Sequence, residues 1–322
     1  MTTRDGLVII VPVKDEEDNI APFLRAVFSE LSQLELDLSI LFVDDGSADG
    51  TLARIQQAAA GDSRIHWLSL SRNFGKEAAM TAGLDHADGA AVVLMDVDLQ
   101  HPPALIHEFV RRWREGYDMV YAVRADRGDS TAGKRGTASL FYRVFNRLSQ
   151  LDIPANAGDF RLLDRRVVAA VRQLPERNRF MKGLFAWPGF RSIGVPFASA
   201  PREAGESKFS YWRLWNFALD GFVSFSTWPL RVWSYIGAGV ALLSFIYAAI
   251  IVADVLVRGR DVPGYASMMT AILFLGGMQL ISIGVLGEYI GRLFTEVKGR
   301  PIYIVRDASH TLPLRQSDAH DY

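Results

Sequence analysis

Two carboxylates and an amide stand at alternate positions in the segment 96–100, which reads DVDLQ. In an extended segment alternate side chains share one face, so we expect the oxygens of Asp96, Asp98 and Gln100 to converge on one hard cation. Mg²⁺ and Mn²⁺ prefer such ligands and bridge them to substrate phosphates. The apolar run before this segment and the His-Pro-Pro turn at 101–103 favour a metal site at the end of a strand over a chance pair of acids.

A second acidic pair, Asp44 and Asp45, opens the segment 44–51, which reads DDGSADGT. Capping of a helix explains part of this segment, because Ser47 and Asp49 can accept backbone N–H bonds. Capping does not explain two adjacent acids at the end of an apolar run. One of them can accept hydrogen bonds from a base or a ribose, so the pair predicts a nucleotide contact.

Basic side chains gather in two further segments. The first contains Arg124 and Arg135 among glycines, and it is either a solvated loop or an anion-binding loop. Ser139 lies four residues after Arg135 in a predicted helix over 138–149, so the two can share one face. The second segment contains Arg202 and Lys208, and it is either a polybasic juxtamembrane stretch or a phosphate site near the membrane.

The elements that must position these residues alternate between strand-like and helix-like stretches up to residue 124. The strands are near-continuous apolar runs, which is typical of a parallel sheet covered on both faces; they are expected at Leu7–Val13, Ser39–Asp44, His66–Ser71, Ala90–Asp96 and Met119–Arg124. Helices are expected near Ala21–Leu34, Thr51–Ala60, Glu77–Ala87 and Pro103–Arg114. The pattern predicts a doubly wound α/β domain, with the acids at the carboxyl ends of strands, where ligands bind.

Two long apolar stretches follow this domain. Val232–Val257 contains a single charge, Asp254, and Ala266–Gly287 contains none. Buried core helices would keep a polar stripe, so we interpret them as an antiparallel transmembrane hairpin. The aromatic stretch before them predicts an interfacial helix, with a soluble core helix as the alternative. The expected regions are a catalytic domain at 1–209, the interfacial helix at 210–231, spans at 232–257 and 266–291, and a C-terminal tail at 292–322. The tail is polar after Arg306, and we expect that part to be frayed.

The composition and the positions of the charged residues limit the possible location and partners of the protein. The 35 basic and 36 acidic residues give no electrostatic case for nucleic acid. The absence of cysteine excludes disulfides and thiolate metal sites, and fits a reducing compartment. The residues flanking the hairpin carry more Lys and Arg than its turn, so the positive-inside rule places the catalytic domain in the cytoplasm; the flanks have Arg213, Arg231, Arg292, Lys298 and Arg300, and the turn has Arg258 and Arg260.

Several blocks in this order resemble the polyprenyl-phosphate glycosyltransferases of glycosyltransferase family 2, especially bactoprenol glucosyltransferases, with dolichyl-phosphate mannose synthases as more distant relatives. The blocks are VPVKDEEDNI, VDDGSADGT, SRNFGKEAAMTAGLDHA, MDVDLQHPP, GDFRLLDR, RFMKGLFAWPGF and GESKFSYW, followed by the two spans. The resemblance implies an A-type glycosyltransferase fold and an inverting reaction that depends on Mg²⁺ or Mn²⁺. It also implies a nucleotide-sugar donor, a polyprenyl phosphate acceptor and a bacterial inner membrane location, and leaves homo-oligomerisation open.

The same resemblance assigns roles to individual residues. Pro12, Glu16 and Asp45 would hold the nucleotide, with Asp44 and Lys76 nearby, and Asp96, Asp98 and Gln100 would face the metal and diphosphate. Arg124, Arg135 and Ser139 would bind the lipid phosphate, and Arg202 and Lys208 the donor phosphates. Asp159 matches the acid near the reacting sugar, so Asp98 and Asp159 are the expected catalytic residues. Lys14 and Asp15 depart from the Tyr-Asn that the family has at these positions, which removes an aromatic able to stack on the base.

Other functions remain open at this point. UDP-glucose is the expected donor, and GDP-mannose, UDP-GlcNAc, UDP-galactose or a UDP-aminoarabinose derivative are alternatives. A processive polysaccharide synthase would carry a Gln-x-x-Arg-Trp block and more spans, which this sequence lacks. A non-catalytic membrane scaffold that binds nucleotide is the alternative of a different class. A phosphate acceptor is already ionised at neutral pH, so we expect Asp159 to orient the acceptor or the sugar, with proton abstraction second.

Overall fold

The computed structural model describes residues 6–124, 157–177, 179–197, 228–258 and 264–309. The chain forms two compact units, one of residues 1–214 with 300–322 and the other of residues 215–299. Four predicted site residues lie outside the described residues and stay predictions: Arg135, Ser139, Arg202 and Lys208. The same holds for the helix expected at 138–149, for most of the expected interfacial helix and for the domain boundary at residue 209.

An eight-stranded sheet forms the centre of the first unit, in the order β7-β5-β6-β4-β1-β2-β3-β8. The strands are β1 (Leu7–Val13), β2 (Leu38–Asp44), β3 (Ile65–Leu70), β4 (Ala91–Leu94), β5 (Met119–Arg124), β6 (Ala157–Asp164), β7 (Ser192–Phe197) and β8 (Val305–Ala308). Strands β4, β1, β2 and β3 are parallel neighbours, as are β5 and β7. Strand β6 is antiparallel to both β4 and β5, and β8 is antiparallel to β3. The sheet is therefore mostly parallel, as predicted.

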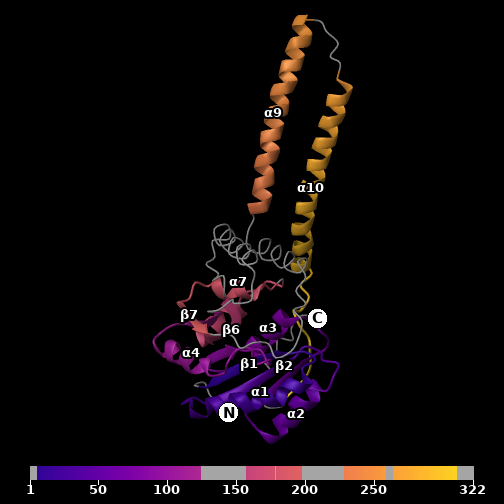
Figure 1. The fold of residues 1–322 in the computed structure, drawn as a ribbon. Helices are drawn as coiled ribbons and strands as arrows, with labels where there is room; N and C mark the ends of the chain where they lie inside the picture. The colour runs from indigo at the N-terminus through magenta and orange to yellow at the C-terminus, as the bar shows by residue number, and fades with distance from the viewer. Residues whose placement is uncertain (1–5, 125–156, 178, 198–227, 259–263, 310–322) are drawn as a thin grey trace. The chain divides into compact units, whose positions relative to one another are not determined.

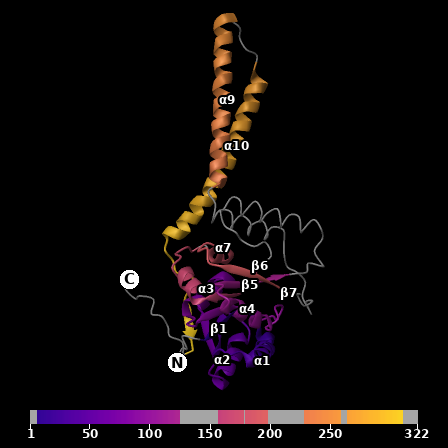
Figure 2. The same ribbon diagram turned by 90° about the vertical axis from the view of Figure 1, so that its left-hand side faces the viewer.

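Helices cover both faces of the sheet (Figures 1 and 2). One face of β1 packs into a core with α1 (Ile20–Glu30), α2 (Thr51–Gly61) and α4 (Leu105–Arg114). The opposite face carries α3 (Lys76–His86), followed in the chain by α6 (Arg165–Arg172) and α7 (Met181–Ala186). Helix α3 lies so close to β1 that a Cβ atom on Gly83 would be 2.3 Å from a methyl group of Ile10. Its small side chains allow this close approach, and its first residue reaches the carboxyl edge of the sheet.

Four-residue β8 corrects the expectation of a frayed tail after Arg306. It pairs with β3, with Leu68 opposite Ala308 and Ser69 opposite Asp307. The chain that leaves the hairpin therefore returns to the sheet and covers its edge strand, which would otherwise present unpaired backbone groups. So short a strand has no apolar alternation of its own to predict it.

The second unit contains α9 (Trp228–Arg258) and α10 (Tyr265–Val297), which lie side by side in Figures 1 and 2. Within them, Tyr235–Ala253 and Phe274–Val297 are long and apolar enough to cross a membrane, and 0% of either stretch is buried. Helix α9 begins four residues before the first predicted span. The last residues of the expected interfacial region, 228–231, are therefore continuous with that helix.

Candidate active site

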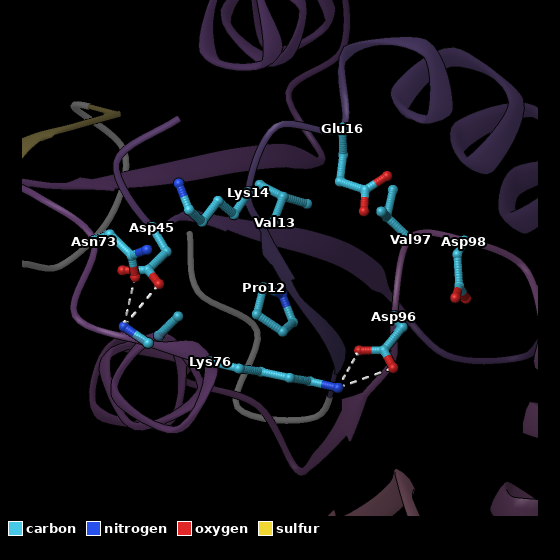
Figure 3. A pocket seen from close by; sticks show the side chains of 12 residues that line it. Pro12, Val13, Lys14, Glu16, Asp45, Asn73, Lys76, Asp96, Val97 and Asp98 are labelled. Atoms are coloured by element: carbon cyan, nitrogen blue, oxygen red, sulfur yellow. Dashed lines mark hydrogen bonds and ion pairs between the residues drawn. The ribbon is translucent and has the colours of Figure 1, made fainter. Parts of the chain in front are cut away.

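A cavity of about 480 Å³ opens at the carboxyl edge of the parallel strands (Figure 3). Its walls come from the ends of β1 and β4, from the loops that follow β1, β2 and β3, and from the first turn of α3. The structure brings together six predicted site residues in this cavity, namely Pro12, Glu16, Asp45, Lys76, Asp96 and Asp98. The remaining lining residues are Val13, Lys14, Asn73, Gly75, Ala79 and Val97.

Asp45 is fixed by backbone donors. Its Oδ1 accepts the N–H of Phe74 at 2.7 Å and its Oδ2 accepts the N–H of Gly75 at 2.8 Å. Gly75 precedes α3 with a φ of 100°, a conformation that suits glycine. Burial raises the pKa of Asp45, and these two N–H bonds oppose the rise. Asp45 thus ties the loop after β2 to the start of α3 while lining the cavity.

Asp44, which is expected near the nucleotide, does not itself line the cavity. It is 0% exposed. Its Oδ1 accepts the N–H of Ser47 at 3.0 Å and its Oδ2 accepts the hydroxyl of Ser69 at 2.9 Å. Successive strand residues point to opposite faces, so of two adjacent acids only one can reach the cavity. Asp44 supports the loop, and Asp45 faces the ligand side.

The loop after β1 forms the wall opposite α3. Glu16 lines the cavity, and its backbone N–H donates to Thr51 Oγ1 at 2.8 Å. Lys14 Nζ lies 3.1 Å from Asp15 Oδ2, and Asp15 has a φ of 53°. The Asp15 carboxylate also accepts the N–H of Ala48 at 2.8 Å, and this bond is the main cause of its lowered pKa. Asp15 therefore shapes the loop, whereas Lys14 is left on the cavity wall.

Lys76 joins two acids that are far apart in the sequence. Its Nζ lies 2.7 Å from Asp96 Oδ1 and 2.9 Å from Asp159 Oδ2, and Figure 3 shows it reaching toward Asp96. Because β6 runs antiparallel to β4, with Arg161 opposite Leu94, its start lies at the edge where β4 ends. Burial favours neutral forms of both partners, yet the mutual charges prevail: they raise the pKa of Lys76 and lower that of Asp159.

Charged residues behind Asp159 were not singled out from the sequence. Burial, followed by the charge of Asp159, raises the pKa of Glu77 to about 7. The Glu77 carboxylate accepts the N–H of Met181, which anchors α7. Arg161 is 3% exposed, donates to the carbonyl of Gly158 at 2.7 Å and stacks on Phe185 at 4.4 Å. The contacts of Arg161 fix the backbone beside Asp159. The bond between Glu77 and Met181 joins residues 104 positions apart, so no local pattern predicts it.

Asp98 and Gln100 do not meet the expected geometry. Strand β4 ends at Leu94, and Leu99 has a φ of 54°, so segment 96–100 is a turn and not an extended strand. The backbone N–H of Gln100 donates to Asp98 Oδ1 at 3.1 Å, and Gln100 is absent from the cavity lining. Among the described residues no group of three or more acids, histidines or cysteines could hold a metal. Two carboxylates on one wall still fit a Mg²⁺ or Mn²⁺ ion that takes its other ligands from water and substrate phosphates.

Arg124 is the one predicted acceptor residue that the structure describes. It is the last residue of β5, opposite Phe197 of the parallel neighbour β7. Since β5 and β4 both run antiparallel to β6, their carboxyl ends share one edge of the sheet. Arg124 therefore lies on the ligand side, one strand beyond Asp159, as the sequence predicts.

His101 was noted only as part of a turn. Its ring centroid lies 5.2 Å from those of Phe160 on β6 and Phe197 on β7, so it packs against side chains of both strands. A Cβ atom on Gly158 would be 3.6 Å from its Nε2. The imidazole therefore fills the space beside the start of β6, the strand that contains Asp159.

Comparison with known proteins agrees with this geometry. Residues 8–172 match the family model described as glycosyl transferase family 2, and residues 228–293 match the model described as GtrB C-terminal hairpin. An uncharacterized glycosyltransferase of Synechocystis is 52% identical over 94% of this chain and 95% of its own length. The SfII prophage-derived bactoprenol glucosyl transferase of Shigella flexneri is 50% identical over 95% of this chain and 99% of its own. A prophage bactoprenol glucosyl transferase homolog of Escherichia coli is 48% identical over 92% of this chain and 97% of its own.

Proposed function

The chain belongs to glycosyl transferase family 2, and from this premise we propose that it transfers a sugar from a UDP-sugar to a polyprenyl phosphate, with glucose as the sugar. One feature of the cavity carries the proposal. Asp45 lies at one end, where it can accept bonds from a nucleoside, and Asp96 and Asp98 lie at the other, where a cation and a diphosphate would sit. The bactoprenol glucosyl transferase relatives support the lipid acceptor and the sugar.

The chain's own residues have distinct tasks in this reaction. The nucleoside is bound by Pro12 near the end of β1, Glu16 in the loop after β1 and Asp45 in the loop after β2, and Asp96 and Asp98 would hold Mg²⁺ or Mn²⁺. The ion supplies positive charge to the diphosphate leaving group. Lys76 adds a second positive charge beside Asp96, and Arg202 and Lys208 would contact the donor phosphates. The arrangement holds two highly charged groups close together, which is the main demand of this chemistry.

Asp159 orients the reacting groups in this proposal. A phosphate monoester has a second pKa near 6, so the attacking oxygen is mostly ionised at neutral pH. A strong general base is therefore not needed. The ion pair with Lys76 keeps Asp159 charged, and Arg161 holds the carbonyl of the preceding residue, Gly158. Attack from the face opposite the diphosphate would invert the anomeric centre.

The acceptor site lies toward β5. Arg124 is at the correct edge of the sheet, and Arg135 and Ser139 would complete a site for the lipid phosphate. We expect Arg135→Ala to raise the polyprenyl phosphate concentration needed for half-maximal rate by roughly ten- to a hundredfold, because one charge-assisted hydrogen bond is lost. UDP affinity should hardly change. Titration of lipid at fixed donor, with calorimetry of UDP and Mn²⁺, separates these effects, and an equal loss of UDP affinity would place Arg135 in the donor site.

We also propose that the hairpin anchors the enzyme in the bacterial inner membrane, with the catalytic unit in the cytoplasm. Reporter fusions at residue 262 and at the C-terminus should then report opposite compartments. The same compartment from both would contradict a spanning hairpin. The polyprenyl phosphate lies in that membrane, so the anchor keeps the active site at the surface where the acceptor is found.

One experiment tests the reaction itself. Purified protein is incubated with polyprenyl phosphate, Mn²⁺ and each of several labelled nucleotide sugars, and lipid-linked label is measured. We expect transfer from UDP-glucose; transfer from UDP-GlcNAc, UDP-galactose or GDP-mannose instead would revise the donor alone. Nucleotide binding without any transfer would favour the non-catalytic scaffold.

A further inference from the structure

Strand β8 carries a charged side chain into the network beneath the cavity. Arg306 Nη2 lies 2.9 Å from Ser69 Oγ, and the same Oγ lies 2.9 Å from Asp44 Oδ2. A hydroxyl has one proton to donate, and a guanidinium can only donate. Ser69 therefore accepts from Arg306 and donates to Asp44. The three groups form a directed relay that ends on a carboxylate.

The buried end of this relay needs compensation. Asp44 and Ser69 are both 0% exposed. A buried carboxylate without a partner is costly, and among the described residues Asp44 forms no ion pair: its oxygens accept from Ser47 and Ser69. Arg306 places a positive charge one hydroxyl away from Asp44.

Asp44 in turn fixes two loops of the cavity. It holds the N–H of Ser47 at 3.0 Å, and Ser47 Oγ accepts the N–H of Asp15 at 3.0 Å. Ser47 thus joins the loop after β2, which begins with Asp45, to the loop after β1, which carries Lys14 and Glu16. Asp45, Lys14 and Glu16 all line the cavity. A change at Arg306 can therefore reach the ligand side through a chain of hydrogen bonds, none longer than 3.0 Å.

The position of β8 does not depend on Arg306 alone. Besides its pairing with β3, the N–H of Ser71 donates to the carbonyl of Ile304 at 2.8 Å, and the N–H of Ser309 donates to the carbonyl of Trp67 at 3.0 Å. Upstream, the Tyr303 hydroxyl donates to Asp85 at 3.0 Å. Substitution of Arg306 should therefore leave the strand in place and remove only the relay.

We propose that Arg306 is a positioning residue for the donor site: it acts through Ser69 and Asp44 on the loops that line the nucleotide cavity. The segment that follows the membrane hairpin thereby takes part in donor binding without touching the donor. This inference rests on the proposed function insofar as the cavity binds a nucleoside diphosphate.

The test uses the full-length protein with Arg306→Ala, Ser69→Ala and the double variant. Calorimetry with UDP and Mn²⁺ should show a Kd about tenfold higher for each single variant, the scale of one lost hydrogen bond to a charged group. The double variant should be no weaker than the weaker single variant, because both changes break one relay. The turnover rate at saturating donor should stay within about twofold. Asp307→Ala is the matched control, since among the described residues its carboxylate accepts only the neighbouring N–H of Ala308.

Hydrogen exchange without nucleotide gives a second readout. Arg306→Ala should speed exchange of the amides of Ser47 and Ala48, whose acceptors belong to the network. Unchanged exchange, additive effects in the double variant, or wild-type UDP affinity in Arg306→Ala would each overturn the inference. If the wild-type protein bound neither UDP nor GDP while the exchange effect was present, the donor assignment would be at fault and not the relay.

Discussion

The acids at the two ends of the cavity are held in different ways. Asp45 accepts two backbone N–H groups, from Phe74 and Gly75. Asp96 shares the single ammonium group of Lys76 with Asp159. A backbone donor cannot leave without deforming its loop, whereas a lysine side chain can rotate away. The Asp45 end, which is the nucleoside end in the proposed function, is therefore fixed before any ligand binds. The Asp96 end, which is the proposed diphosphate end, can exchange Lys76 for a cation and substrate phosphates.

The pKa values of the acids at the two ends also differ. At Asp45 burial outweighs its hydrogen bonds, so its pKa is raised, whereas at Asp159 the positive charge of Lys76 outweighs burial and the pKa is lowered. Charge is thus concentrated where the diphosphate would depart in the proposed reaction. Substitutions at the diphosphate end should therefore alter the rate, and substitutions at the nucleoside end should alter affinity.

The largest effect is expected at Asp98. Among the described residues its carboxylate accepts only the N–H of Gln100, so unlike Asp96 it has no cation partner. Asp98→Ala should lower the turnover rate by about a thousandfold or more, because several kcal/mol of charge stabilisation are lost. EDTA should reproduce this loss in the wild-type enzyme, and added Mn²⁺ should reverse it. Full activity in saturating EDTA would refute the metal site and the division between the two ends.

Lys76→Met should have the next largest effect. The charge of Lys76 lowers the pKa of Asp159, so without the ammonium group Asp159 takes up a proton at a higher pH than in the wild type. We expect turnover to fall by about a hundredfold, the scale of one lost electrostatic contact in an active site. The acid limb of the pH–rate profile should move to higher pH. Lys14→Met, at the other lysine of the cavity, is the control. A similar pH–rate profile for both variants would contradict the difference between the two ends of the cavity.

The region behind Asp159 can be tested through stability. The pKa of Glu77 is raised to about 7, so between about pH 5 and pH 7 the folded protein keeps a proton that the unfolded chain releases. Its stabilising contribution is complete below this range and lost as pH rises through 7, by at most about 3 kcal/mol. Glu77→Gln should remain neutral, so its Tm relative to wild type should rise from pH 5 to pH 8.

Glu35→Gln serves as the control for this measurement, because the Glu35 side chain is 85% exposed. It should show no such trend. A constant difference between Glu77→Gln and the wild type across the pH range would mean that Glu77 is already ionised in the folded protein. The diphosphate end would then be less strongly coupled to α7 than the contact with Met181 indicates.

The nucleoside end could be predicted from the sequence more fully than the diphosphate end. Apolar runs such as Leu7–Val13 reveal parallel strands, and their carboxyl ends locate Asp45 and Asp96. The runs predict the mostly parallel α/β sheet, the family resemblance predicts the A-type glycosyltransferase fold, and both are confirmed. Strand β6 was missed because Asp159 and Arg161 interrupt its apolar residues, and because it enters the sheet between β4 and β5 after a long separation in the chain.

Long-range contacts set the same limit within the site. The family resemblance indicated Asp159 and Lys76 separately, but only the antiparallel register of β6 places them 2.9 Å apart. The assumption that side chains alternate along an extended segment also placed Gln100 wrongly beside Asp98. Leu99 has a positive φ, so the chain turns after Asp98. A left-handed residue that is not glycine leaves no mark in the sequence.

The smallest expected effect is at Lys14, where the resembling family has tyrosine. Lys14 lines the nucleoside end, and its ion pair with Asp15 is exposed, with 40% and 46% of the two side chains accessible. Such pairs contribute little to stability, so Lys14→Tyr should fold normally. An aromatic ring that stacks on the base is worth about 0.5–1.5 kcal/mol, which predicts a Kd for UDP lower by about two- to tenfold and an unchanged turnover rate. Lys14→Leu separates stacking from loss of the charge, since it should give no such gain. A change in turnover without a change in UDP affinity would show that this loop acts on the diphosphate end, and that the two ends of the cavity are not independent.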